Sequence, residues 1–134
     1  MIAVEERYLA PVSHNKNTVR QAENLVARRL DAAGWQLLAR NARTRHGELD
    51  IVARDVDALV FVEVKAGRRN AAYGPERPAL AVDRRKQQRI RRLAAAWLAD
   101  HRDAPHCQTI RFDVVGVTFD RGRATAIEHI RNAF

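Results

Sequence analysis

Hydrophobic and polar positions alternate most clearly between Gly47 and Lys65. Residues 47–53 and 58–65 are two alternating runs rich in β-branched side chains, and the polar stretch Asp55–Asp57 separates them. Such alternation is typical of half-buried strands, and a short polar break between two runs indicates a hairpin. We therefore predict two antiparallel strands joined by a turn at residues 55–58.

This turn determines which side chains face each other across the hairpin. Asp50 would lie opposite Glu63, and Glu48 opposite Lys65, with Cβ atoms about 4.5–5.5 Å apart on one face. The other face would carry apolar pairs, namely Leu49–Val64, Ile51–Val62 and Ala53–Val60. Two opposed carboxylates repel each other, and a divalent cation such as Mg²⁺ would offset that cost. A register slip of one residue would turn all these side chains to the opposite face.

The rest of the chain predicts two helices and three further strands. The helices run from Asn17 or Thr18 to Ala33 and, capped by Asp83, to about His101; the strands are Trp35–Arg40, Gln108–Phe119 with a bulge near Gly116, and Ala124–Ile130. With the hairpin, the order is α-β-β-β-α-β-β, an α/β fold in which helices flank a mixed sheet. Residues 1–16 lack periodicity and are expected to form a loose arm before a single domain at 17–134.

Apolar residues at helical spacing define the buried face of each predicted helix. They are Val19, Ala22, Val26, Leu30 and Ala33 in the first helix, and Ile90, Leu93, Ala94, Trp97 and Leu98 in the second. Glu23 intrudes on the first of these faces. It is either an edge glutamate paired with Arg20 or a third acidic group beside the hairpin carboxylates.

The excess of basic residues in the chain indicates an anionic partner. The chain has 24 basic and 16 acidic residues, a net charge of +8 and a pI near 10.9, and only three of the basic residues are lysine. Arginine binds phosphate oxygens bidentately, and a pI above about 9 is typical of nucleic-acid-binding domains. The candidate nucleic-acid contacts lie in the 41–47 loop, the loop after Lys65 and the second helix: Arg43, Arg45, Arg68, Arg69, Arg84, Arg85, Lys86 and Arg89. An arginine-rich coding bias and a solvated helix face are the alternatives.

Cys107 is the single cysteine, which excludes a disulfide framework and a cysteine metal cluster. No long apolar run suggests a signal peptide or a membrane span, so we expect a cytoplasmic protein without membrane contact. His46 could serve as a ligand or base, although a lone loop histidine is more often neither.

An Asp followed on the next strand by Glu-x-Lys is the pattern of the PD-(D/E)XK nucleases, the restriction-endonuclease-like superfamily. The segments 47–52, 61–65, 111–115 and 129–134 together resemble the YraN-like family of predicted endonucleases. The resemblance covers about residues 18 to 134 and departs at Ala22, where that family usually has glycine. The glutamate of the first helix, with the Asp and Glu-x-Lys, is also similar to archaeal Holliday-junction resolvases. The resemblance implies a DNA nuclease fold and leaves open branched or junction DNA as a substrate and a homodimer.

The residue types of this motif, carboxylates beside a lysine, are those that phosphodiester hydrolysis requires. A metal ion neutralises phosphate charge and lowers the pKa of a bound water. Asp50 and Glu63 would hold Mg²⁺ or Mn²⁺ with the Val64 carbonyl, Lys65 would orient the water or stabilise developing charge, and Glu23 would hold a water of the metal shell or assist a second ion. The alternatives are a charge network of Glu48–Lys65 beside Asp50–Glu63 in a non-catalytic nucleic-acid-binding or scaffold protein, and a basic RNA- or ribosome-associated domain.

Overall fold

The computed structural model describes residues 16–69 and 77–134. The elements follow the predicted order, with one additional short 3₁₀ helix. They are α1 (Lys16–Ala32), β1 (Gln36–Thr44), β2 (Gly47–Asp55), β3 (Ala58–Arg68), η1 (Pro78–Ala81), α2 (Arg84–Asp100), β4 (Thr109–Asp120) and β5 (Arg123–Ile130). The mixed α/β fold is thus confirmed. Within the described residues, no helix is both long enough and apolar enough to cross a membrane.

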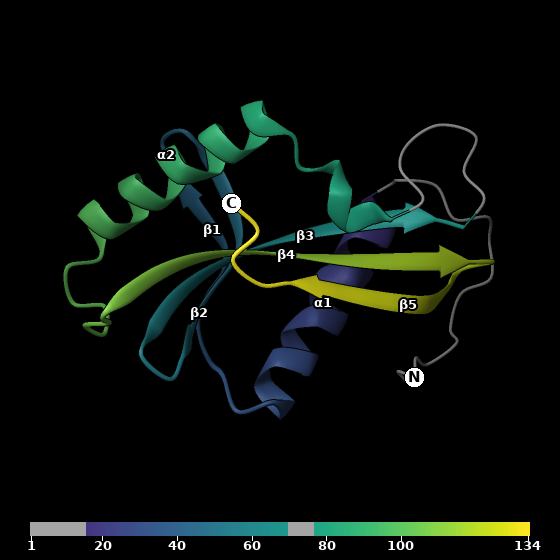
Figure 1. Ribbon diagram of the computed structural model, residues 1–134, viewed down its shortest axis with the longest axis horizontal. Coiled ribbons are helices and arrows are strands. Elements are labelled where there is room, and N and C mark those ends of the chain that lie inside the picture. Colours follow the sequence, from purple (N-terminus) through teal and green to yellow (C-terminus); the bar gives the residue numbers. More distant parts are fainter. Residues whose placement is uncertain (1–15, 70–76) are drawn as a thin grey trace.

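The five strands form one open sheet in the order β1-β2-β3-β4-β5. Neighbours are antiparallel except β3 and β4, which are parallel. A parallel pair needs a long crossover, and the segment containing η1 and α2 supplies it. Figure 1 shows α1 on one face of the sheet and α2 on the other, so the central strands are buried on both sides.

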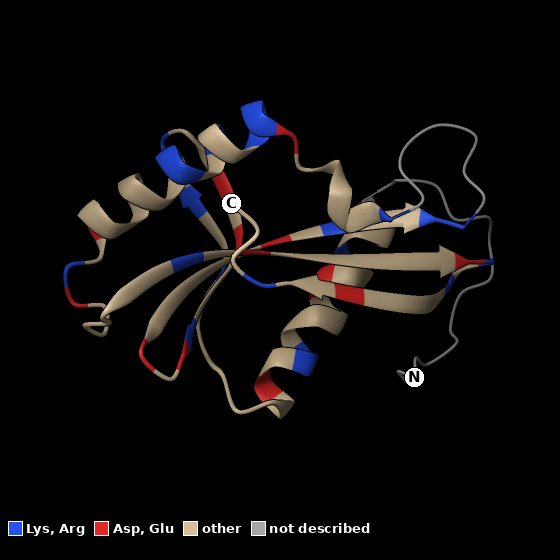
Figure 2. Cartoon of the chain, in the orientation of Figure 1, with Lys and Arg blue, Asp and Glu red and all other residues tan. Residues whose placement is uncertain are grey.

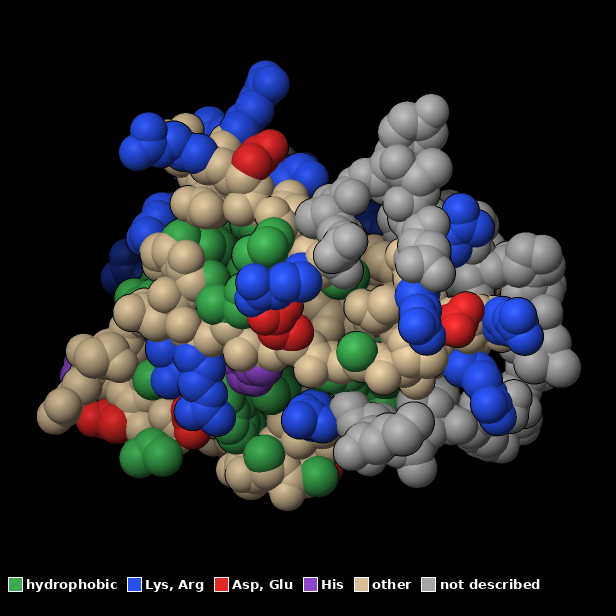
Figure 3. Space-filling view, turned by 45° about the vertical axis from the view of Figure 1, so that its right-hand side comes forward, with side chains coloured by type: hydrophobic (Ala, Val, Ile, Leu, Met, Phe, Trp, Pro, Cys, Tyr) green, Lys and Arg blue, Asp and Glu red, His purple; other side chains and the backbone are tan. Residues whose placement is uncertain are grey.

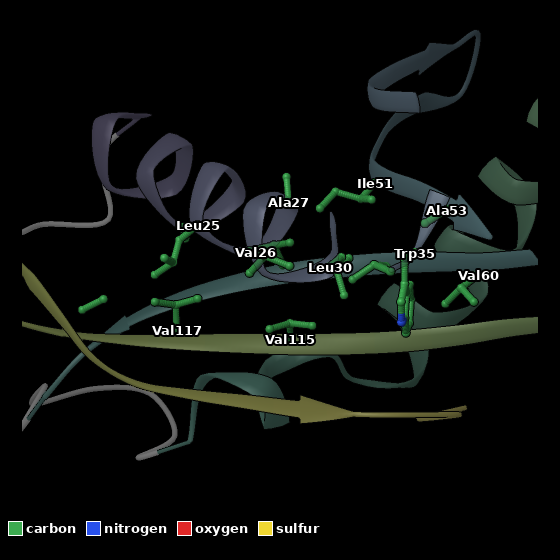
Figure 4. Packing of buried hydrophobic residues seen from close by; sticks show 14 of the residues in the cluster. Leu25, Val26, Ala27, Leu30, Trp35, Ile51, Ala53, Val60, Val115 and Val117 are labelled. Atoms are coloured by element: carbon green, nitrogen blue, oxygen red, sulfur yellow. The ribbon is translucent and has the colours of Figure 1, made fainter. Parts of the chain in front are cut away.

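Each helix encloses its own apolar cluster against the sheet. On the α1 face, Leu25, Val26 and Leu30 pack over Val115 and Val117 (Figure 4). On the α2 face, Leu93 and Trp97 belong to a cluster with the rings of Phe61 and Phe112. The predicted stripe of α2 is confirmed at Ile90, Leu93, Ala94 and Trp97, all of which are buried. In α1 the buried face is shifted: Val19 and Ala33 are exposed, whereas Leu25 and Ala27 are buried.

The predicted hairpin is formed with the predicted register near its turn. Five pairs run from Ile51–Val62 to Asp55–Ala58, and residues 56 and 57 form the turn. Val56 has a φ of +53° there, which is unusual for a β-branched residue. Asp57 anchors the turn, because its carbonyl accepts the amide of Gln108 at 3.0 Å.

Several predicted boundaries were wrong. Residues 41–44, predicted as loop, continue β1, because Ala42, Arg43 and Thr44 pair with Leu49, Glu48 and Gly47. Residues 66–68 likewise extend β3 by pairing with β4. Lys16 begins α1 rather than ending the N-terminal arm. The remaining part of that arm and residues 70–75 of the predicted basic loop lie outside the described residues.

The predicted bulge near Gly116 was also wrong. The register of β4 with β5 shifts at Thr118/Phe119 instead. Gly116 has another role, because a Cβ there would lie 2.4 Å from the backbone nitrogen of Ala79. The glycine therefore allows η1 to approach β4 closely.

Candidate active site

The two carboxylates predicted to bind metal, Asp50 and Glu63, lie where β2 separates from β3. The β2–β3 pairing ends at Ile51–Val62, so Asp50 does not lie opposite Glu63 in the ladder as predicted. The Asp50 carboxylate instead accepts the Val64 amide at 2.8 Å. Leu49 belongs to the α2 cluster while Ile51 belongs to the α1 cluster, which corrects the prediction that both lie on one face. The alternation therefore breaks at Asp50, at the point where the β2–β3 ladder ends.

Glu63 and Lys65 lie on the same side of β3, as their spacing requires. Lys65 Nζ is 3.2 Å from Glu63 Oε2, and both side chains are partly buried. The predicted pairing of Glu48 with Lys65 was wrong, because the carboxylate of Glu48 is 3.7 Å from Arg43. Since Lys65 is directed at Glu63, it stands beside the carboxylate cluster.

Glu23 reaches the same place from α1. Its side chain points inward and is only 9% exposed. It shares a hydrogen bond with the carboxyl group of Asp50. The alternative pairing of Glu23 with Arg20 is not formed between these two described residues; the cation that acts on Glu23 is Arg40. Glu23, Asp50 and Glu63 thus form a cluster contributed by three different elements.

Burial and mutual repulsion shift the pKa values of the carboxyl groups in this cluster. Burial, and then the charge of Glu63, raise the pKa of Asp50 to about 9, although the Val64 amide acts in the opposite direction. Burial also raises the pKa of Glu23, opposed by its hydrogen bond with Asp50 and by Arg40. Without a cation, the cluster therefore holds at least one proton at neutral pH. Such perturbed groups are common at functional sites.

The donor set of the cluster is suited to a hard divalent cation. Asp50 and Glu63 supply carboxylate oxygens, the ligands that Mg²⁺ prefers, and Val64 adjoins them through its amide. In their present positions, no three His, Cys, Asp or Glu side chains among the described residues are arranged to hold an ion. The carboxyl groups are instead hydrogen-bonded to each other, as protonated acids are.

Arg40 is a site neighbour that the sequence analysis missed. It lies on β1 opposite Ile51, and its guanidinium donates a 2.6 Å hydrogen bond to Asn24 of α1. The sequence placed Arg40 only at the end of the first predicted strand. Its proximity to Glu23 depends on how α1 folds over the sheet.

The predicted phosphate contacts divide into three groups. Arg84, Arg85, Lys86 and Arg89 are exposed in the first part of α2. Figure 2 marks basic positions along this helix, and Figure 3 shows basic side chains projecting from the upper part of the molecule. Arg43 and Arg45 are exposed at the β1–β2 turn, together with His46. Arg89 adjoins this turn, because a Cβ on Gly47 would lie 3.4 Å from its guanidinium. Arg68 and Arg69 lie at the end of β3, and Arg69 is 3.8 Å from Asp120.

A second cluster of polar groups, centred on the carboxylate of Asp113, was not predicted. Asp113 on β4 is fully buried, and it accepts hydrogen bonds from Arg111 (2.9 and 3.1 Å), His129 Nε2 (2.8 Å) and the Asn132 amide (3.0 Å). Burial alone would raise the pKa of Asp113, but these hydrogen bonds outweigh it and lower the pKa. The sequence feature that could have revealed this cluster is an aspartate within an otherwise apolar strand. Because all its acceptor oxygens are engaged within the protein, Asp113 stabilises the fold rather than offering a ligand site.

Comparison with known proteins identifies relatives over most of the chain. The model of the uncharacterised protein family UPF0102 matches residues 22–117. A UPF0102 protein of Rhodococcus jostii is 46% identical over 123 residues, covering 92% of this chain and 100% of the relative. One of Nocardia farcinica is 47% identical over 126 residues, covering 94% and 95%. One of Geobacter metallireducens is 46% identical over 121 residues, covering 90% and 94%. Their names state no activity.

Proposed function

The chain belongs to the uncharacterised protein family UPF0102, and we propose that it is a metal-dependent endonuclease that hydrolyses phosphodiester bonds of DNA. The observation that carries the proposal is the meeting of Glu23, Asp50 and Glu63 beside Lys65, at the point where β2 leaves β3. The same residues underlie the proposed membership of the PD-(D/E)XK superfamily. The net charge of +8 supports an anionic substrate.

Each residue has a distinct proposed role. Asp50 and Glu63, with the Val64 carbonyl, would hold Mg²⁺ or Mn²⁺. When bound, the metal would supply charge neutralisation at the phosphate and a more acidic water. The Val64 amide fixes the orientation of the Asp50 carboxylate. Lys65 would turn from Glu63 toward the scissile phosphate and stabilise the charge that develops there. Glu23 would hold a water of the metal shell.

A second candidate function is a non-catalytic nucleic-acid-binding or scaffold protein. The 3.2 Å contact of Lys65 with Glu63 favours it, because a lysine engaged in an ion pair is not free to stabilise a phosphate. The hydrogen-bonded carboxyl groups are also consistent with a site that never binds metal.

Cleavage of defined substrates separates the two functions. Single-stranded, duplex, flap and four-way-junction DNA should be incubated with Mg²⁺, Mn²⁺ or EDTA, since branched or junction DNA is part of the proposal. For an endonuclease, we expect metal-dependent cleavage that Lys65→Ala reduces by on the order of 10²-fold, as for loss of one electrostatic stabiliser, with DNA binding retained. The exposed Asp31→Asn serves as the control and should cut normally.

The non-catalytic alternative gives the opposite pattern. Wild-type protein would cut none of the substrates with either metal, and Lys65→Ala would lower the melting temperature, because Glu63 would lose its ion-pair partner. A stable Lys65→Ala that cuts as well as wild type would remove this lysine from the mechanism.

A further inference from the structure

A second basic surface lies on α1, apart from the arginines predicted from the sequence to bind nucleic acid. Arg20, Asn24 and Arg28 are spaced four residues apart, so they lie along one face of the helix, and all three are exposed. Arg40 adds a further exposed guanidinium by donating to the Asn24 side chain at 2.6 Å. These four residues are named the α1 basic strip.

The strip borders the carboxylate cluster directly. Glu23 precedes Asn24 in α1, but its side chain points inward and is hydrogen-bonded to Asp50. Arg40 connects the strip to the cluster, because it contacts Asn24 on one side and attracts the Glu23 carboxylate on the other. A backbone that follows the strip would therefore pass beside the carboxylates.

The two α1 arginines of the strip have no acidic partner within the described part of the chain. Arg20 and Arg28 form no ion pair with residues in the ranges 16–69 and 77–134. The exposed Asp31 lies on the same face at the far end of α1, so an excess of positive charge remains along the strip. Figure 2 shows both signs of charge along this helix.

We infer that the α1 basic strip binds the phosphate backbone of the DNA that the carboxylate cluster would cut. The inference rests on the proposed function. Guanidinium groups bind phosphate oxygens through paired hydrogen bonds, and asparagine side chains also donate to the backbone. Such contacts position the duplex without reading its sequence. The strip thus provides phosphate contacts from α1, on the opposite face of the sheet from α2.

Salt-dependent binding tests this surface with a matched control. The test protein carries Arg20→Gln and Arg28→Gln, because glutamine keeps a high helix propensity. The control carries Arg29→Gln and Arg102→Gln, which remove the same charge from exposed positions outside the strip. Affinity for a labelled DNA duplex is measured by anisotropy between about 50 and 200 mM salt in EDTA, so that no cleavage occurs. Circular dichroism verifies that both proteins are folded.

We expect the slope of log K against log[salt] to fall by about 1.8 in the test protein and to stay unchanged in the control, since each phosphate contact contributes about 0.9. Equal slopes in the two variants, or no change in either, would overturn the inference, as would a wild-type protein that binds no DNA. Wild type that binds DNA but never cuts it would overturn the endonuclease proposal and leave the strip intact.

Discussion

Asp50 retains a proton at neutral pH, because burial and the charge of Glu63 raise its pKa to about 9. In the unfolded chain an aspartate titrates near 3.9. Between these two values the folded state binds more protons than the unfolded state, so stability falls as pH rises. Metal binding would displace this proton and should therefore strengthen with pH.

The variant Asp50→Asn tests this electrostatic account. Asparagine carries no charge and can still accept the Val64 amide. We expect wild type without divalent metal to lose up to about 1.4 kcal/mol of unfolding free energy per unit as pH rises from 5 toward 9. The variant should show a flatter profile and exceed wild type near pH 9. Urea unfolding across this range measures both profiles.

The control for this comparison is Asp31→Asn, which removes an exposed carboxylate of α1. Its profile should follow that of wild type. Parallel profiles for wild type and Asp50→Asn would mean that Asp50 is ionised in the folded protein.

The sequence was most informative about single residues where the periodicity of a strand or helix determines the direction of the side chain. Glu63 and Lys65 share one side of β3 because a strand alternates every residue, and Glu23 faces inward because of helical periodicity. The partner of Asp50 could not be predicted, because it depends on where β2 leaves β3. Arg40 was missed for a similar reason, since an exposed residue on an edge strand gives no sign of which helix will cover it.

At the level of elements, the β2–β3 turn contains a local conflict between residue type and backbone. Val56 has a φ of +53° and is 86% exposed, so little packing compensates for the strain. Its carbonyl accepts the Arg54 side chain at 2.9 Å, an interaction that any residue at this position retains. The sequence predicted the turn from its polarity but could not predict this dihedral angle.

Val56→Asn should stabilise the protein by about 1 kcal/mol, because asparagine tolerates positive φ and a non-glycine residue held there costs about 1–3 kcal/mol. Thermal or urea unfolding measures the gain. Val56→Thr retains the β-branch and should leave stability nearly unchanged. An equal gain for threonine would show that hydrophobic exposure, not the backbone angle, determines the effect.

Element boundaries were predicted less well than element types. The end of β1 is polar and resembled a loop, but an edge strand can pair Arg43 and Thr44 through their backbone alone. η1 is too short for periodicity to reveal it. Gly116 suggested a bulge, whereas its actual constraint is the approach of Ala79, a contact between segments distant in the sequence.

At the scale of the whole molecule, the Asp113 cluster joins parts of the chain that are far apart. Arg111 contacts both Asp113 and Asp55 at the end of β2 (3.1 Å to Asp55), while His129 and Asn132 connect β5 and the C-terminal segment to Asp113. That segment continues to Phe134, which stacks on Phe112 at 5.1 Å. The sequence placed Asp113 in a strand but could not identify these partners.

Asp113→Ala should lower the unfolding free energy by about 3–5 kcal/mol, because removing one member of a buried ion pair leaves its partners without compensation. Asp120→Ala is the matched control, since its carboxylate on the same strand is more exposed and lies 3.8 Å from Arg69; a surface pair contributes about 0–1 kcal/mol. The pKa of Asp113 is lowered in the folded protein, so its contribution is complete above about pH 3.9 and is lost as pH falls through the folded pKa. Urea unfolding near pH 7 should therefore show the full difference between wild type and Asp113→Ala, and the same measurement in acid should show it shrinking. A loss equal to that of Asp120→Ala would mean that the C-terminal segment is held by the packing of Phe134 and not by the buried carboxylate.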